Sequence, residues 1–191
     1  MAIALLSGAV TTTGVRATQT REGEAIDHTQ PGETDMDVEQ FRDLIKPVAE
    51  AVAGRPVEPD LGEELDRRFP PDGAQFRAIE SACHEAIAAG WMCAQGGAGR
   101  RFGRVIEPGP QTADLSVDVV DLTDIVGPHH RHPNGEICMV MPVTATARFD
   151  GKGAGWKVYP PGSAHWPTVT DGRALVLYML PGGQIEFTAA A

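Results

Sequence analysis

Four side chains that commonly bind metal ions lie in one part of this chain: His130, His132, Glu136 and His165. The first three form the pattern His-x-His-x-x-x-Glu, and the fourth ends the segment Pro-Pro-Gly-Ser-Ala-His. Three imidazoles and a carboxylate suit Fe, Mn, Zn, Ni or Cu better than Mg or Ca. The pattern therefore predicts a divalent transition metal and a reaction centre, without selecting the ion.

The spacing of these residues explains how they can converge. On a β-strand, side chains two residues apart point to the same face, so the first two histidines aim at one point. Asn134-Gly135 favours a tight turn that returns Glu136 on the next strand. A second turn at Pro160–Gly162 brings the last histidine from a distant strand. His129 faces the other way and is left outside the ligand set.

An unmetallated polar cluster is the alternative, because short histidine motifs also arise by chance. The chain has six histidines, and those at positions 129, 130, 132 and 165 surround Glu136, which favours the metal site. Cys138 lies two residues after Glu136 and shares its strand face. It could line the site, although a small buried hydrophobe is the more frequent role for such a cysteine.

The first 90 residues contain no candidate barrel strand. Residues 1–35 show no apolar periodicity and are predicted to form a flexible tail. Residues 36–90 form a helical region, with helices expected at 41–54, 61–69 and 72–90. Pro47 predicts a kink or a break in the first helix. Asp72 with Gln75 resembles a capping box that opens the third.

From residue 91 onward the pattern changes to short strands separated by Gly- and Pro-rich turns. Several short strands with regular turns indicate a sandwich or a barrel. The sequence thus predicts a mainly β fold with an N-terminal helical region. The strands are expected at 102–106, 116–122, 136–141, 145–149, 156–159, 174–180 and 185–187.

Composition argues against several function classes. The net charge is −10, from 26 acidic and 16 basic residues, and no basic stripe is present. We therefore expect no nucleic-acid partner. The apolar start Ala2–Leu6 is too short to span a bilayer and lacks a basic flank, so no membrane partner is expected. Three scattered cysteines indicate reduced thiols and a cytoplasmic location.

The ligand residues resemble the two motifs of the cupin superfamily. The core of the first is His130-x-His132-x3-Glu136. Positions 142 or 143 lack its closing glycine, Gly127 lies closer to the histidines than usual, and Val169 replaces the final asparagine of the second motif. The resemblance covers about residues 100–188 and implies a cupin-type double-stranded β-helix, a small β-barrel, which we place at residues 91–191. The residues that represent the second motif are Gly155, Pro160, Gly162 and His165.

A narrower resemblance extends from Met36 to Phe187 and is to the 4-hydroxylaminobenzoate lyase family. It implies conversion of 4-hydroxylaminobenzoate and water into 3,4-dihydroxybenzoate (protocatechuate) and ammonia, a step of nitroaromatic degradation. The reaction is redox-neutral, in keeping with the lack of a dinucleotide-binding or Walker-type loop. Glu136 and His165 would move protons in it. The segments that carry the resemblance are 41–54, 69–80, 90–93, 101–105, 129–136 and 159–165.

The implied substrate is a small aromatic carboxylate, which calls for an arginine partner. Arg101 and Arg104 flank Phe102-Gly103 on the first predicted barrel strand, and their opposite faces mean that only one points inward. Solvated surface charge is the alternative for both, and Arg148 and Arg173 are further candidates. Tyr159 and Trp166 could stack on the substrate ring or could belong to the barrel core.

Two other function classes stay open. One is a cupin dioxygenase, or another metal-dependent cupin enzyme, that acts on a small aromatic substrate. The other is a non-enzymatic cupin that binds a small ligand, although a complete ligand set disfavours it. In each case the helical region could mediate a homodimer.

Overall fold

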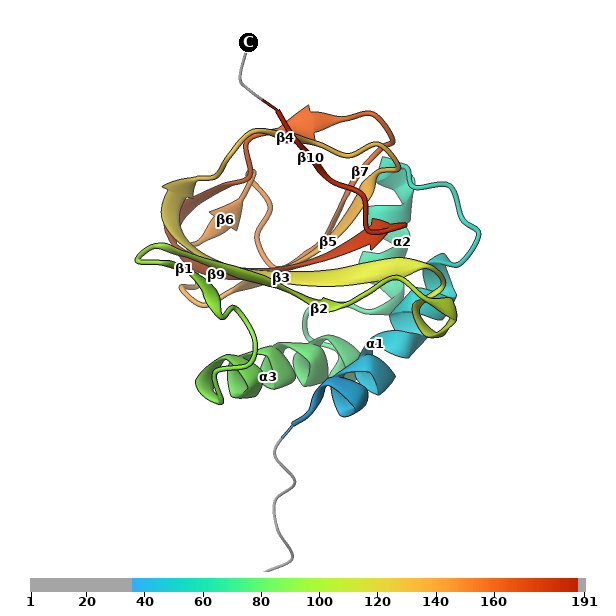
Figure 1. Cartoon of the computed structure of the whole chain (residues 1–191), viewed down its shortest axis with the longest axis horizontal. Coiled ribbons are helices and arrows are strands. Elements are labelled where there is room, and N and C mark those ends of the chain that lie inside the picture. Colours follow the sequence, from blue (N-terminus) through green and yellow to red (C-terminus); the bar gives the residue numbers. More distant parts are fainter. Residues whose placement is uncertain (1–35, 189–191) are drawn as a thin grey trace, which may run out of the picture. The chain divides into compact units, whose positions relative to one another are not determined.

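The computed structural model describes residues 36–188, which form three helices followed by strands (Figure 1). The predicted flexible tail, residues 1–35, lies outside the described residues. The helices are α1 (Val38–Val52), α2 (Pro59–Arg68) and α3 (Ala74–Ala88), and a 3-10 helix, η1 (Pro110–Thr112), follows later. Among the described residues, no helix is long and apolar enough to cross a membrane.

Helix α1 begins at a capping box that the sequence analysis missed. The Asp37 carboxylate accepts from the Gln40 amide nitrogen at 2.8 Å, and the Gln40 side chain accepts from the Asp37 nitrogen at 3.0 Å. The helix then runs through Pro47 without a break. Phe41 and Val48 are fully buried on its apolar side. This packing holds the helix together where local preference alone favours interruption.

Helix α3 starts differently from the prediction. Its N-cap is Gly73, with no side-chain cap, so the predicted capping box of Asp72 and Gln75 is wrong. The Gln75 amide instead donates to the carbonyl of Leu44 at 2.6 Å. The side chain expected to cap its own helix therefore joins α3 to α1.

The described strands form two antiparallel sheets. In the large sheet the order is β1-β2-β3-β9-β5-β7, with β6 paired to β9. In the small sheet the order is β10-β4-β8. The strands of the large sheet are β1 (Gln95–Gly97), β2 (Arg100–Ile106), β3 (Leu115–Val126), β5 (Glu136–Pro142), β6 (Arg148–Phe149), β7 (Gly155–Tyr159) and β9 (Thr168–Pro181), and those of the small sheet are β4 (His130–Arg131), β8 (Ala164–His165) and β10 (Glu186–Phe187).

Alternation along the large sheet divides its side chains between two apolar clusters. Val119, Met139 and Leu177 lie on the face that packs against the helices. Their neighbours Cys138 and Val176 belong to the cluster on the opposite face, between the two sheets. In Figure 1, α1 and α3 lie on the side of the large sheet that faces away from β4 and β10. The helices therefore cover the outside of the barrel, and the site develops inside it.

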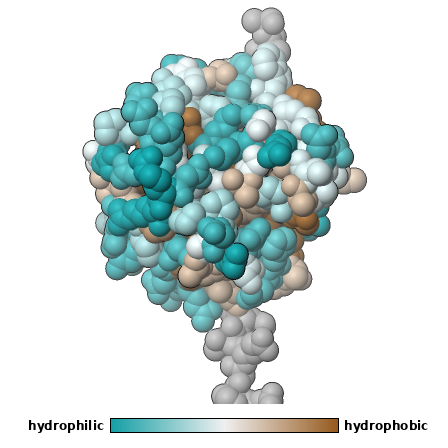
Figure 2. Space-filling model, turned by 180° about the vertical axis from the view of Figure 1, so that it is seen from behind, coloured by the Kyte–Doolittle hydropathy of each residue, from teal (hydrophilic) through white to brown (hydrophobic). Residues whose placement is uncertain are grey.

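The helical region and the large sheet share one core, which includes Phe41, Phe76 and Trp156. The described residues, 36–188, accordingly belong to a single compact unit. The predicted boundary between a helical region (36–90) and a barrel (91–191) follows the order of the elements, and as a domain boundary it stays a prediction. The face shown in Figure 2 is mostly hydrophilic, with hydrophobic residues in small, scattered groups.

Candidate metal centre

Two tight turns bring the four predicted ligands together. The Gly135 nitrogen donates to the His132 carbonyl at 3.3 Å, which closes the turn ahead of Glu136. Gly135 has a φ of +86°, and a Cβ there would lie 2.9 Å from the Tyr159 carbonyl oxygen. Only glycine fits this turn without strain. The predicted return of Glu136 beside the two histidines is confirmed.

The second turn returns the chain to the small sheet. The Gly162 nitrogen donates to the His132 carbonyl at 2.7 Å, and the His132 nitrogen donates to the Ser163 carbonyl at 2.9 Å. These bonds set the register in which His130 of β4 lies opposite His165 of β8. Backbone pairing of β8 with β4 therefore places His165 beside His130.

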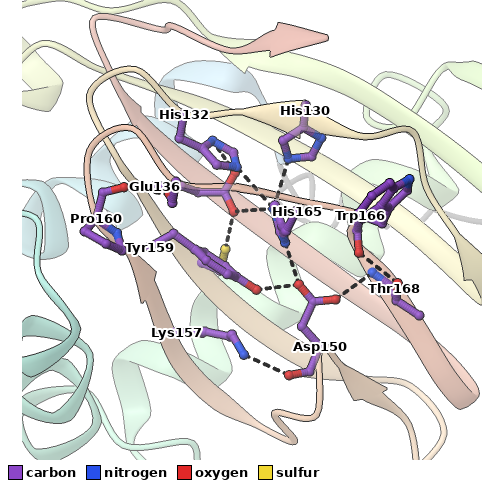
Figure 3. Close-up of polar contacts among 12 residues, drawn as sticks. His130, His132, Glu136, Asp150, Lys157, Tyr159, Pro160, His165, Trp166 and Thr168 are labelled. Atoms are coloured by element: carbon purple, nitrogen blue, oxygen red, sulfur yellow. Dashed lines mark hydrogen bonds and ion pairs between the residues drawn. The ribbon is translucent and has the colours of Figure 1, made fainter. Parts of the chain in front are cut away.

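The ligand atoms converge on one point between the sheets (Figure 3). One Nδ1 or Nε2 atom of each histidine and one oxygen of Glu136 all lie within 4.8 Å of one another. The Nε2 atom of His165 lies 3.0 Å from that of His130 and 3.1 Å from that of His132. His130, His132 and Glu136 are buried, and His165 is nearly so. The cluster could therefore bind a metal.

The converging nitrogen atoms of the cluster fit a cation. Three imidazole nitrogens at such distances cannot all be satisfied by hydrogen bonds to one another, because each ring offers either a proton or a lone pair. One nitrogen from each ring can instead share an ion about 2.0–2.2 Å away, with a Glu136 oxygen as the fourth ligand. His132 Nδ1, on the other side of its ring, lies 3.1 Å from Glu136 Oε2.

The electrostatics of the site agree with that fit. Burial, together with the neighbouring imidazoles, lowers the pKa of His130 to about 4 and that of His132 to about 3. Both rings are therefore neutral near pH 7, which is the form that binds metals. Burial raises the pKa of Glu136 to about 8. A buried carboxyl of this kind becomes a favourable anion when a cation lies beside it.

Asp150 supports the site, and the sequence analysis missed it. Its carboxylate lies 2.6 Å from His165 Nδ1, and the Tyr159 hydroxyl and the Thr168 nitrogen donate to the same group (Figure 3). The bond to Nδ1 orients the His165 ring so that Nε2 faces the other ligands. In the sequence, Asp150 stands in an ordinary Asp-Gly turn. No spacing rule links it to His165.

Cys138 contacts the ligand set directly. Its thiol donates to Glu136 Oε1 at 2.7 Å, and the residue is fully buried. Burial and the nearby Glu136 raise the pKa of this thiol, so it stays protonated. Both readings of this cysteine therefore apply, since it packs as a small buried side chain and also holds one carboxylate oxygen in place.

A cavity of about 310 Å³ opens onto the cluster, with His130 in its wall. Most of its lining is apolar and comes from the strands of the large sheet and from the segments that flank the small one. The polar groups in this lining include Arg100, Arg104 and Asp118. Concave apolar sites with a few fixed polar groups are the usual form of a small-molecule site.

The two arginines predicted to bind substrate lie on opposite faces of β2, as expected from the strand alternation. Arg101 points away from the cavity and donates to Asp121 at 2.7 Å, beside Arg173. Arg104 lines the cavity, where it donates to Asp118 at 2.9 Å. The structure thus brings Arg104 to the cavity and leaves Arg101 outside. A substrate role for either stays a prediction.

The two predicted aromatic contacts are placed differently from each other. The Tyr159 ring lies at the metal cluster, with its centroid 4.3 Å from that of His165. Trp166 is 47% exposed and packs against His129, with the ring centroids 4.1 Å apart. His129 itself lies outside the ligand set, and its Nδ1 contacts the Thr188 hydroxyl at 2.5 Å. Contact of Tyr159 or Trp166 with substrate stays a prediction.

A mainly antiparallel β fold, with three histidines and a glutamate between its sheets, defines a cupin. Among solved structures, an RmlC-like cupin protein from Ralstonia eutropha JMP134 is 13% identical, covers 50% of this chain and 64% of its own, and has a TM-score of 0.37.

Comparison of sequences identifies the family within this class. The model of the 4-hydroxylaminobenzoate lyase family, PnbB, matches residues 43–187. The chain belongs to this family. It is 29% identical over 140 residues to a 4-hydroxylaminobenzoate lyase from Pseudomonas putida, which covers 64% of this chain and 80% of the relative. A lyase of the same name from Nocardioides sp. (strain LMS-CY) is 28% identical over 137 residues, covering 67% and 81%.

Proposed function

We propose that the protein is a metal-dependent carbon–nitrogen lyase that converts 4-hydroxylaminobenzoate and water into 3,4-dihydroxybenzoate and ammonia, as a step of nitroaromatic degradation. The observation that carries this proposal is family membership over residues 43–187, in a chain that keeps a complete set of three histidines and one glutamate. The atoms of the reaction balance without an external oxidant or reductant. No redox cofactor is therefore needed.

The cavity suits one substituted benzene ring. Its volume of about 310 Å³ and its mostly apolar lining favour a small aromatic molecule over a sugar or a nucleotide. Val120, Leu122 and Leu180 supply apolar surface for a ring. Because His130 forms part of the wall, a ring held there presents one substituent to the metal centre.

The chain would hold the ion through His130, His132, Glu136 and His165. When bound, a divalent Fe, Mn, Zn or Ni ion supplies Lewis acidity that weakens an N–O bond. Glu136 is proposed to move protons between the substrate and water through a carboxylate oxygen that does not hold the ion. His165 would do so only while its Nε2 is free of the ion, because Asp150 holds its Nδ1. Asp150 keeps the His165 ring in one orientation throughout, through its contact with Nδ1.

Elemental analysis of the purified protein, combined with an anaerobic assay on 4-hydroxylaminobenzoate, tests this function. We expect one transition-metal ion per chain and equal amounts of ammonia and 3,4-dihydroxybenzoate without oxygen. Chelation should abolish the activity, and the ion should restore it. Oxygen consumption with ring opening would favour the cupin dioxygenase. Tight binding with no turnover under any condition would favour a ligand-binding cupin.

A further inference from the structure

Arg100 lies in the wall of the cavity, and its charge is not matched by a neighbouring acid. It begins β2 and pairs with Leu122 of β3. It shares the inward face of β2 with Phe102 and Arg104, and all three line the cavity. Its guanidinium lies over the Phe102 ring, 5.1 Å from the centroid. Within residues 36–188, the arginines that form ion pairs are Arg55, Arg101, Arg104, Arg131 and Arg173, and Arg100 is not among them.

Arg104, by contrast, is already engaged. It donates to Asp118 at 2.9 Å, to Glu107 at 3.3 Å and to the carbonyl of Gly183 at 2.9 Å. Its donors and its charge are therefore largely satisfied by the protein. With Asp118 offsetting Arg104, the arginine in the cavity lining whose charge stays unpaired is Arg100. A positive charge in a mostly apolar recess attracts an anion.

The cavity has two chemically different walls. Arg100 stands on the large sheet, and His130 stands on the small sheet. Gln95 of β1 pairs with Phe102 and lines the cavity near Arg100, where its amide can donate a further hydrogen bond. A flat molecule with an anionic group at one end and a metal-seeking group at the other can satisfy both walls at once.

We propose that Arg100, held by its stacking on Phe102, binds the carboxylate of an aryl carboxylate substrate and sets the specificity for it. A guanidinium presents paired donors that match the two oxygens of a carboxylate. The identity of the substrate rests on the proposed lyase function, whereas anion binding at Arg100 rests on the cavity itself. Arg100 acts here as a specificity-determining residue, and Arg104 helps to form the wall.

Binding measurements on the metal-loaded protein test this assignment without turnover. The probes are 4-aminobenzoate and its uncharged analogue 4-aminobenzamide, each titrated calorimetrically. In Arg100→Met, the affinity for 4-aminobenzoate should fall roughly tenfold to hundredfold, the loss expected for charge-assisted hydrogen bonds, while that for 4-aminobenzamide changes little. Arg77→Met, at an exposed position of α3 outside the cavity, is the matched control and should bind both probes as the wild type does.

Further variants keep the test decisive if Arg100→Met folds poorly. Arg100→Lys should retain part of the affinity for 4-aminobenzoate, and Arg100→Gln should lose nearly as much as the methionine variant. Unchanged binding of 4-aminobenzoate in a folded Arg100 variant would overturn the assignment. An equal loss for both probes would also overturn it, because that result indicates a structural role.

Kinetics separate this inference from the lyase proposal. With 4-hydroxylaminobenzoate, Arg100→Met should raise KM, and with N-phenylhydroxylamine, which lacks the carboxylate, KM should stay close to that of the wild type. If the wild-type protein releases no ammonia but the two binding probes behave as expected, the lyase proposal fails and the Arg100 assignment stands. If the wild type releases ammonia and Arg100→Met has the same KM for 4-hydroxylaminobenzoate as the wild type, the lyase proposal stands and the Arg100 assignment fails.

Discussion

The two faces of the large sheet contain similar apolar residues, but only one of them leaves space for a ligand. On the outer face, Val119, Met139 and Leu177 are fully buried against the helices. On the inner face, Val120 is only partly buried, because it lines the cavity. The close-packed outer face thus stabilises the fold, and the inner face is packed less closely, which leaves space for a ligand.

The inner face also concentrates the polar groups that an apolar core would exclude. Glu136 and Cys138 alternate along β5 with Ile137 and Met139, so ligand chemistry and core packing occupy the two sides of one strand. Buried polar groups usually destabilise a fold unless they are paired. On the outer face the buried Asp121 is paired with Arg101 and Arg173, whereas the polar groups of the inner face converge on one point, as a binding site requires.

The largest expected effect is on the inner face. His132→Ala removes a fully buried ligand. We expect the variant to lose its bound metal and to release no detectable ammonia. Elemental analysis and the anaerobic assay measure both, with circular dichroism to check the fold. His84→Ala, at an exposed position of α3, is the control and should change neither. Full activity in His132→Ala would contradict the assignment of a catalytic metal to the inner face.

A smaller effect should follow when a ligand loses its orienting partner. Asp150→Asn keeps the shape of the side chain but weakens the contact with His165 Nδ1, which is 2.6 Å in the structure. Metal affinity should fall about 10- to 100-fold, as is typical for partners of metal-bound histidines. Competition with a chelator measures this, and Asp171→Asn, at an exposed position of β9, is the control. An unchanged metal affinity would reduce Asp150 to a purely structural contact.

Substitutions of two neighbouring valines allow the packing of the two faces to be compared directly. Val119→Ala removes two methyl groups from the filled outer face and should lower the free energy of unfolding by about 2 kcal/mol. Val120→Ala removes the same atoms from the cavity wall and should cost less than about 1 kcal/mol, because that side chain is not fully packed. Urea unfolding measures both variants. Equal losses would mean that the cavity collapses in solution.

The smallest expected effect concerns acid stability at the edge of the outer face. Burial by itself raises the pKa of Asp121, but hydrogen bonds from Arg173 and then Arg101 outweigh it, and the pKa lies below its ordinary value. This carboxylate therefore stabilises the fold above about pH 4, the pKa of an unfolded aspartate, and the contribution fades as the pH falls toward the lower, folded value.

Asp121→Asn removes this titration. The variant should lose less stability than the wild type between about pH 5 and pH 2, even though it is slightly less stable at pH 7. Urea unfolding as a function of pH measures the difference. An identical acid slope in both proteins would show that these arginines contribute nothing measurable.

Much of this organisation could be predicted because it follows local rules. The spacing of His130 and His132, the turn at Gly135 and the alternation along β5 depend on a few neighbouring residues, and each was confirmed. Asp150 could not be found in this way, because its contact with His165 depends on how two distant turns approach each other.

Arg100 was missed for a different reason. The predicted strand began at residue 102, two residues too late, whereas β2 begins at Arg100. The signal was present, since Arg100 stands two and four residues before Phe102 and Arg104 and therefore shares their face. The capping box predicted at Asp72 failed because Gln75 bonds to α1 instead. At Pro47 a kink or a break was predicted, and the break does not occur because tertiary packing outweighs local preference.

The ligand set has a mechanical consequence, since its members come from both sheets. His130 and His165 belong to the small sheet, and Glu136 begins a strand of the large one. An ion bound to all of them would link the small sheet to the large sheet. Release of the ion and separation of the sheets then become one event, so the metal should leave slowly, at the rate at which the barrel opens.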